Sequence, residues 1–336
     1  MRILVTGTAG FIGFHLARRL LDEGHEVVGL DGFTSYYDVE LKRRRHQILL
    51  ARNGFREERM MLADMAGLER VWTETSFEIV IHLAAQAGVR YSLEFPREYV
   101  EANLVGTFNV MELTRQRPVK HFMLASTSSV YGGNLEMPFK ESARADHPLT
   151  LYAATKKATE LMAHSYSHLW NIPTTAFRFF SVYGPWGRPD MALFKFTRGI
   201  VEGTPIDIYN YGRMERDFTY VEDLVEAIAL LVHCPPGRNS DNTLNDAENL
   251  DSRVAPFRVV NIGAGVPSGL MAFLEEIEKN VGKKAIRNMM PMQPGDVPAT
   301  FASIDVLMKL TGYQPSTPVS VGVKAFVDWY RSYYGG

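Results

Sequence analysis

The sequence predicts an α/β fold in which a doubly wound parallel sheet is followed by a smaller C-terminal α/β domain. Over the first two-thirds of the chain, short apolar runs alternate with longer amphipathic stretches, which is the pattern of strand–helix units in a parallel sheet. The first unit also carries three glycines at the turn between its strand and its helix. After about Gly184 the alternation becomes less regular, while Pro, Gly and aromatic residues become frequent. This change marks the expected boundary between the two domains.

The individual elements follow from the length and continuity of the apolar runs. Short runs predict buried strands at Ile3–Thr6, Val27–Asp31, Met60–Ala63, Ile79–Ala84, His121–Ser126 and Thr174–Phe180. Helical patterns occupy Phe14–Glu23, Pro96–Arg117 and Tyr152–Leu169, and later helices are expected near Ser268–Val281 and Ser320–Tyr333.

We assign residues 1–183 to the first domain and residues 184–336 mainly to the second. Phe257–Ile262 again has the pattern of a buried strand, so part of residues 215–265 is expected to return to the first domain. The segment Pro235–Pro256 is rich in Asn, Asp, Ser and Pro, which predicts an exposed, mobile loop.

Composition excludes several classes of protein. The chain has 336 residues, of which 46% are hydrophobic and 22% charged, so it can bury a sizeable core. A net charge of -2 argues against binding nucleic acid through a bulk positive field. Cys234 is the only cysteine, so an intrachain disulfide is excluded, which fits a reducing compartment. Because no long apolar run occurs, we expect no membrane span and a cytoplasmic protein.

A glycine-rich turn joins the first strand to the first helix. Gly7, Gly10 and Gly13 are spaced G-x-x-G-x-x-G, which lets the backbone curve tightly and approach a pyrophosphate at the helix N-terminus. Asp31 ends the second strand, where a carboxylate can bond the adenosine ribose hydroxyls and would repel a 2′-phosphate. These residues predict a Rossmann-type protein that binds NAD rather than NADP. The basic run Lys42–Arg45 is interpreted as a solvated helix face.

Two later segments occur in the right order for one extended cofactor. Asp64, which ends the expected third strand, can meet the adenine edge. The fourth strand runs into His82–Ala87, where small residues would let the backbone lie against the cofactor.

Tyr152 and Lys156 form the candidate catalytic pair. They are spaced i and i+4 in an expected helix, so their side chains share one face. A positive charge near a phenol favours its anion, so we expect Lys156 to lower the pKa of Tyr152. The segment Ser126–Gly132 follows the fifth strand, whose end is expected near the nicotinamide at the carboxyl edge of the sheet. A hydroxyl group there can bond a substrate oxygen while Tyr152 moves its proton.

Seven motifs occur in the order found in extended short-chain dehydrogenases/reductases that act on nucleotide sugars, and the match covers essentially the whole chain. They are TGxxGFIG, HLAAQAGVRYS, STSSVYG, YxxxK, RFFSVYGPWGRPDMA, RDFTYVED and QPGDVP. Within that superfamily the chain most resembles the bacterial UDP-glucuronate 4-epimerases. The resemblance implies a catalytic triad of Thr127, Tyr152 and Lys156. It also implies NAD contacts with Gly7, Gly10, Gly13, Asp31 and Asp64, joined by Phe11, Ile12, Met65, Leu83, Ala84, Ala85, Tyr152, Lys156, Phe179 and Val182.

The residues after Thr127 indicate which reaction follows. Dehydratases that resemble this chain carry Asp-Glu after the catalytic Thr, and decarboxylases tend to carry Ser-Glu. This chain has Ser128-Ser129 and neither acid, which points to epimerisation at C4 of the sugar through a 4-keto intermediate. Galactose-type epimerases usually have Ser-Ala-Thr here, so the extra serines suggest a C6 carboxylate to hold. Arg90 could add positive charge there, and Ser181 another hydroxyl.

Epimerisation requires the keto sugar to turn over while the nucleotide is held. Arg188 and Arg216 are suited to the diphosphate. Gln293 and Asp296, in QPGDVP, are expected on the nucleotide side of the site.

The expected function is therefore NAD-dependent interconversion of UDP-glucuronate and UDP-galacturonate by a homodimer, with no metal site and no nucleic-acid or membrane partner. Three alternatives stay open. They are a 4-epimerase acting on UDP-galactose or a UDP-N-acetylhexosamine, a UDP-glucuronate decarboxylase, and a non-catalytic NAD-binding regulator.

Overall fold

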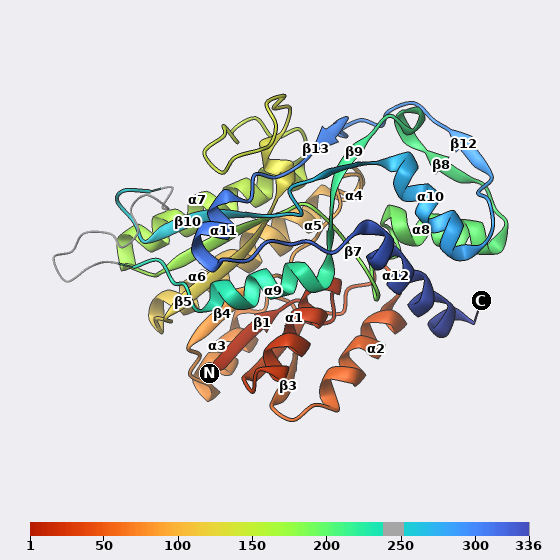
Figure 1. The fold of residues 1–336 in the computed structure, drawn as a ribbon. Coiled ribbons are helices and arrows are strands. Elements are labelled where there is room, and N and C mark those ends of the chain that lie inside the picture. The colour runs from red at the N-terminus through yellow and green to blue at the C-terminus, as the bar shows by residue number, and fades with distance from the viewer. Residues whose placement is uncertain (238–251, 336) are drawn as a thin grey trace.

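The computed structural model describes residues 1–237 and 252–335 (Figure 1). Most of the expected loop Pro235–Pro256 therefore lies outside the described residues. None of the described helices is both long and apolar enough to cross a membrane.

A seven-stranded sheet forms the centre of the molecule, and all its neighbouring strands are parallel. The strand order is β10-β6-β5-β4-β1-β2-β3. The strands are β1 (Arg2–Thr6), β2 (Glu26–Asp31), β3 (Phe55–Arg59), β4 (Ile79–His82), β5 (His121–Thr127), β6 (Thr174–Phe179) and β10 (Phe257–Ile262). The order reverses direction between β1 and β4, which is where such sheets bind ligands.

Helices cover both faces of this sheet because its strands alternate apolar residues between two cores. In β1, for example, Ile3 and Val5 pack on one face and Leu4 on the other. Helices α1, α9 and α11 pack into the first core, and α3, α6 and α7 into the second. The helices of this part are α1 (Phe11–Asp22), α2 (Val39–Leu50), α3 (Met65–Glu74), α4 (Tyr91–Glu94), α5 (Pro96–Tyr99), α6 (Gly106–Gln116), α7 (Leu151–Trp170), α9 (Val221–Val232) and α11 (Asp305–Thr311).

A separate apolar core lies in the C-terminal part of the chain, where the rings of Phe218 and Phe273 stack 3.9 Å apart. Its helices are α8 (Ala192–Glu202), α10 (Leu270–Val281) and α12 (Val319–Tyr334). One small sheet joins β7 (Ser181–Tyr183), β9 (Glu215–Tyr220), β11 (Pro267–Gly269) and β13 (Ala299–Thr300), and another pairs β8 (Ile206–Ile208) with β12 (Arg287–Met289). As expected, the chain returns to the large sheet at β10, between β9 and α10.

Three sequence interpretations need correction. The third strand is Phe55–Arg59, not Met60–Ala63, because this edge strand carries charged residues and no apolar run marks it. The predicted helix Pro96–Arg117 is interrupted by the π-helical turn η1 (Val100–Val105). The basic run of α2 is only half solvated, since Lys42 and Arg45 are buried.

Candidate active site

The glycine-rich turn has the geometry that a dinucleotide requires. Gly7 has a φ of +83°, and a Cβ there would lie 2.9 Å from the backbone nitrogen of Ala84. A Cβ on Gly13 would lie 2.1 Å from the carbonyl oxygen of Gly7. Gly10 begins α1 and offers no side chain to cap it, so the amides of the first turn can receive an anion. The turn therefore forms a cradle that fits a pyrophosphate.

Asp31 ends β2, as predicted, and its carboxylate also shapes the turn. One oxygen accepts a hydrogen bond from the amide of Ala9 at 2.9 Å, and the other from the amide of Phe33 at 2.8 Å. A carboxylate offers about four acceptor positions, so it can still bond two ribose hydroxyls.

The remaining cofactor candidates lie on several elements of the fold. The amides of Leu83 and Ala84 donate to the hydroxyl of Thr6 at 3.1 and 3.0 Å, which holds their backbone beside the glycine-rich turn. Asp64 does not end a strand; it is exposed, and its side chain caps α3 by accepting from the amide of Gly67 at 3.0 Å. The other candidates keep the expected order, with Phe11 and Ile12 opening α1, Met65 opening α3, Ala85 after β4, Phe179 ending β6 and Val182 in β7.

Thr127 ends β5, and Ser128 and Ser129 follow it in the short helical turn η2 (Ser128–Tyr131). The Thr127 hydroxyl accepts from the amide of Ser129 at 3.2 Å and donates to the Ser129 hydroxyl at 3.2 Å. Three hydroxyl groups are thus concentrated at the carboxyl end of one central strand.

Tyr152 and Lys156 both lie on α7, and Tyr152 is within hydrogen-bonding reach of Thr127. Burial raises the pKa of Tyr152, while the hydrogen bond with Thr127 and the charge of Arg188 lower it only in part. Desolvation of the phenolate thus dominates in the protein chain, and the expectation that Lys156 lowers the pKa of Tyr152 stays a prediction.

Burial also lowers the pKa of Lys156 to about 8, and the negative charge of Glu160 opposes that shift. Glu160 lies one turn further along α7 and was missed at the level of sequence. Two nitrogens of Arg178 donate to its carboxylate at 2.9 and 2.8 Å, and Ser126 donates at 2.6 Å. Although burial opposes ionisation, these partners lower the pKa of Glu160 to about 2. The i+4 spacing of Glu160 after Lys156 is the sequence feature from which their interaction could have been predicted.

A second missed residue joins the catalytic helix to the cofactor strand. Asn103, buried in the π-helical turn η1, accepts from the amide of Gln86 at 2.8 Å. Its amide nitrogen donates to the Gln86 carbonyl at 3.1 Å and to the Thr155 hydroxyl at 3.0 Å. These bonds fix α7 relative to the loop after β4.

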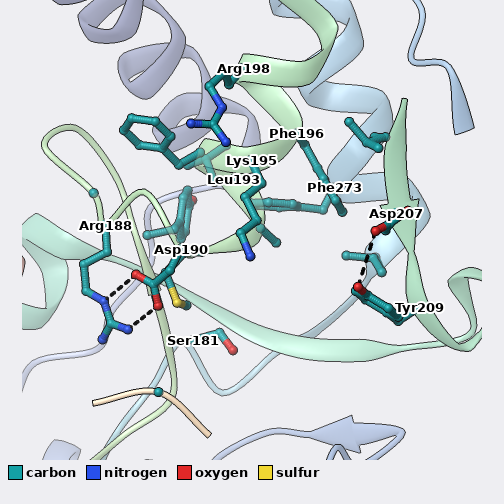
Figure 2. A pocket seen from close by; sticks show the side chains of 18 of the residues that line it. Ser181, Arg188, Asp190, Leu193, Lys195, Phe196, Arg198, Asp207, Tyr209 and Phe273 are labelled. Carbon is teal, nitrogen blue, oxygen red and sulfur yellow. Dashed lines mark hydrogen bonds and ion pairs between the residues drawn. The ribbon is translucent and has the colours of Figure 1, made fainter. Parts of the chain in front are cut away.

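A cavity of about 860 Å³ lies between the two parts of the chain. Predicted cofactor residues Phe11 and Val182 line it together with the predicted substrate residues Arg90, Ser181, Arg188, Arg216 and Asp296. Figure 2 shows the Arg188–Asp190 pair on one side and Asp207 with Tyr209 on the other. The predicted residues Thr127, Ser128, Ser129, Tyr152 and Gln293 are not among the lining residues. The carbonyl of Gln293 closes a turn by accepting from the amide of Asp296 at 3.2 Å.

The three predicted substrate arginines have different partners. Arg188 makes two hydrogen bonds to Asp190. Arg90 forms an ion pair with Asp296 at 3.0 Å and lies over the ring of Tyr209. Arg216 instead donates to backbone carbonyls, including that of Val297 at 2.7 Å. Burial lowers the pKa of Arg216, and the charge of Asp296 only partly offsets it. The hydrogen bonds that the structure shows for Arg216 are thus made to neutral groups.

One group of residues in the described chain has ligand atoms close enough to hold a metal ion. Glu23, His25 and His233 place such atoms within 4.8 Å of one another. Glu23 and His25 precede β2 and His233 follows α9, so the group lies at the amino edge of the sheet. Arg19 already pairs with Glu23 at 2.8 Å. These residues do not line the cavity.

Comparison with known proteins agrees with this geometry. The NAD dependent epimerase/dehydratase family matches residues 3–245. A Rhizobium meliloti protein described as "Probable UDP-glucuronate 4-epimerase" is 61% identical over 99% of this chain and 98% of its own length. Protein CapI of Staphylococcus aureus is 51% identical over 99% of both chains. A solved UDP-glucuronic acid 4-epimerase from Bacillus cereus, in complex with UDP-glucuronic acid and NAD, aligns with a TM-score of 0.87 and 31% identity over 99% of this chain and 100% of that one.

The chain therefore belongs to the NAD dependent epimerase/dehydratase family. This confirms the resemblance to extended short-chain dehydrogenases/reductases, the fold class and the use of NAD. The roles of the individual site residues remain predictions.

Replacing Glu160 with Gln tests the charge balance beneath the catalytic pair. Without the carboxylate, the pKa of Lys156 falls further, so the alkaline limb of kcat/KM for the nucleotide sugar moves to lower pH. The variant also leaves Arg178 buried without its partner, which costs about 3–5 kcal/mol of folding free energy. The measurements are a pH–rate profile and thermal unfolding. Lys157→Met, which removes only a more exposed partner of Glu160, is the control and should change stability by less than about 1 kcal/mol. An alkaline limb that does not move in Glu160→Gln would refute the claim that the charge of Glu160 raises the pKa of Lys156.

Proposed function

We propose that this protein is a UDP-glucuronate 4-epimerase, which interconverts UDP-glucuronate and UDP-galacturonate with bound NAD. The observation that carries the proposal is the turn after β5, where Thr127, Ser128 and Ser129 present hydroxyl groups and no carboxylate. A dehydratase needs an acid and a base at this position to eliminate water. The 61% identity to the R. meliloti protein supports the same activity.

The chain's own residues supply proton transfer, orientation and charge. When bound, NAD provides the acceptor and later the donor of the C4 hydride. Tyr152 as phenolate removes the proton of the C4 hydroxyl and returns it after the sugar has turned. Thr127 bonds the same oxygen and holds Tyr152 in place. Lys156, buried beneath the pair, is placed to bond the nicotinamide ribose and to favour the phenolate once its ammonium group is fixed there.

The cavity suits a substrate held by its nucleotide and free at its sugar. Arg216 lines the cavity and donates to neutral backbone carbonyls, so a diphosphate can give its guanidinium an anionic partner. Arg90 and Asp296 close the same side of the cavity. A volume of about 860 Å³ can accommodate a nucleotide sugar.

The serine hydroxyls also protect the intermediate. A 4-keto uronic acid is a β-keto acid and loses CO2 easily. Hydrogen bonds from Ser128 and Ser129 to the C6 carboxylate keep its charge on the oxygens, which opposes the flow of electrons into the ring. Each such bond is worth about 1.5–3 kcal/mol, enough to slow decarboxylation by about tenfold or more.

We also propose that the protein acts as a homodimer through α6 and α7. Phe108 on α6 and Leu161 on α7 are 45% and 59% exposed, so two neighbouring helices present apolar surface that a second copy of the chain could cover. We further infer a cytoplasmic location, because the one cysteine is left as a free thiol. We also propose that the product is used in making acidic polysaccharide.

Incubation with UDP-glucuronate, without added NAD and followed by NMR, tests the proposed reaction. Wild type is expected to yield UDP-galacturonate; a pentose product with CO2, or no reaction, would contradict the proposal.

Tyr152→Phe should reduce turnover by about 100- to 10,000-fold while nucleotide-sugar binding stays nearly unchanged, since only the proton-transfer group is lost. Thr127→Ala should be milder, because Ser129 or water can substitute. Near-normal turnover in Tyr152→Phe would remove Tyr152 from the mechanism.

Replacing both Ser128 and Ser129 with Ala tests the role of the turn in fidelity. We expect modestly slower epimerisation. We also expect the fraction of turnovers that end as 4-keto-pentose and CO2 to rise by about tenfold or more, because the carboxylate is less restrained. Product NMR and CO2 release measure the partition. A substrate with a neutral C6 is the control and should be handled relatively better than by wild type. No additional CO2 with unchanged sugar preference would show that the serines only form the turn.

Leu161→Glu tests the dimer. A charge buried in an apolar interface is costly, so the dimer dissociation constant should rise by at least about a hundredfold in analytical ultracentrifugation. The control is Leu135→Glu, at a leucine that is 84% exposed outside the two helices, and it should behave as wild type. A monomeric wild type, or an unaffected Leu161→Glu dimer, would refute the proposed interface.

A further inference from the structure

Arg45 is a fully buried arginine on α2 that no catalytic step uses. One terminal nitrogen donates to the carbonyl of Ala9 at 2.8 Å and to the hydroxyl of Tyr37 at 2.8 Å. The other donates to the carbonyl of Trp186 and, at 3.5 Å, to that of Gly187. Arg45 therefore connects the glycine-rich turn with the loop that follows β7. We call this set of bonds the Arg45 bridge.

The bridge is held by carbonyl groups rather than by a counter-ion. Arg43 and Arg44, its exposed neighbours, both pair with Glu40, whereas no ion pair involves Arg45 in the described part of the chain. Burying a guanidinium without a carboxylate is unfavourable, so its bonds to the two loops must offset a large desolvation cost. A residue placed this way is suited to fixing the two loops relative to each other.

The loop on the far side of the bridge is held in a conformation that it would not adopt alone. Trp186 has a φ of +61°, in the left-handed region that side chains other than glycine rarely occupy. Such residues persist only where the surroundings over-determine them. Here the ring of Trp186 packs on Phe14 at 5.6 Å and on Trp329 at 5.3 Å, while Arg45 holds its carbonyl. The next carbonyl back, that of Pro185, accepts from His15 at 2.9 Å.

This loop leads directly to Arg188, one of the arginines that line the cavity (Figure 2). Arg188 is bonded to Asp190, and Asp190 also accepts from the hydroxyl of Tyr36 at 3.0 Å. Tyr36 belongs to the segment between β2 and α2, a few residues after Asp31. The segment from Asp31 to Arg45 therefore contacts both the cofactor turn and the arginine loop.

We propose that Arg45 is a positioning residue that fixes Arg188 relative to the cofactor turn, so that the two binding sites are assembled together. This rests on the proposed function, in which Arg188 binds an anionic group of the nucleotide sugar. Arg45 itself touches neither ligand and acts through the backbone of Trp186 and Gly187.

A double-mutant cycle on the NAD-loaded protein tests this role. All variants carry Tyr152→Phe so that the bound sugar is not turned over, and binding of UDP-glucuronate is measured by calorimetry. Arg45→Met should weaken binding about tenfold, because Arg188 loses its fixed position. Arg188→Met should weaken it at least as much, and the double variant should bind no more weakly than Arg188→Met alone. Arg44→Met, on the same helix but exposed, is the matched control and should bind as the parent does.

A purely structural role predicts a different pattern. If the two losses multiply in the double variant, or if Arg45→Met binds as the parent does, the proposal is overturned. Should Arg45→Met fail to fold, Arg45→Lys replaces it: lysine keeps the charge but cannot span both loops, so binding should still weaken, and full affinity would refute the bridge.

UDP alone is the second probe and separates the bridge from the proposed substrate. A wild-type protein that binds UDP but does not bind UDP-glucuronate would contradict the proposed function, and the bridge would then be judged by the same cycle with UDP. Absence of binding to either probe would refute the bridge as well, because Arg188 would then have no ligand to position.

Discussion

Every pair of neighbouring strands in the large sheet is parallel, so all seven strands end at the same edge. The rest of the site depends on this constraint. Asp31 ends β2, Thr127 ends β5 and Phe179 ends β6, so residues far apart in sequence emerge at the same edge of the sheet. The reversal of strand order at β1 and β4 opens a crevice at that edge. The C-terminal part of the chain then closes the crevice into a cavity.

Buried charge is the cost of building a reactive site at that edge, and the structure distributes it over several elements. Lys156 lies buried one helical turn after Tyr152, and Glu160 supplies the negative charge that partly restores the pKa of Lys156. Glu160 is in turn held by Arg178 on β6 and Ser126 on β5. The network thus joins α7 to the two strands that carry Thr127 and Phe179. The same hydrogen bonds therefore lower the pKa of Glu160 and hold α7 against β5 and β6.

The substrate side follows a different principle. Arg90 and Arg188 already have acidic partners, whereas the hydrogen bonds of Arg216 within the described residues go to backbone carbonyls. A diphosphate could pair with Arg216 directly but would have to share Arg188 with Asp190. A firmly held nucleotide and a loosely held sugar are what 4-epimerisation needs, because the intermediate must present both faces to the same hydride donor.

Local patterns in the sequence determined the sheet, the glycine-rich turn and the catalytic spacing, because each depends on residues close together in the chain. The Tyr152–Lys156 pair, Asp31 at the end of a strand and β10 at Phe257–Ile262 all follow from such patterns. The edge strand β3 was not predicted, because a strand at the edge of a sheet can carry charged residues in place of an apolar run. Only the tertiary structure decided that Arg45 is buried while Arg44 is solvated, that Tyr36 meets Asp190, and that burial raises the pKa of Tyr152. These outcomes depend on desolvation and on contacts between distant segments, and neither is encoded in the spacing of neighbouring residues.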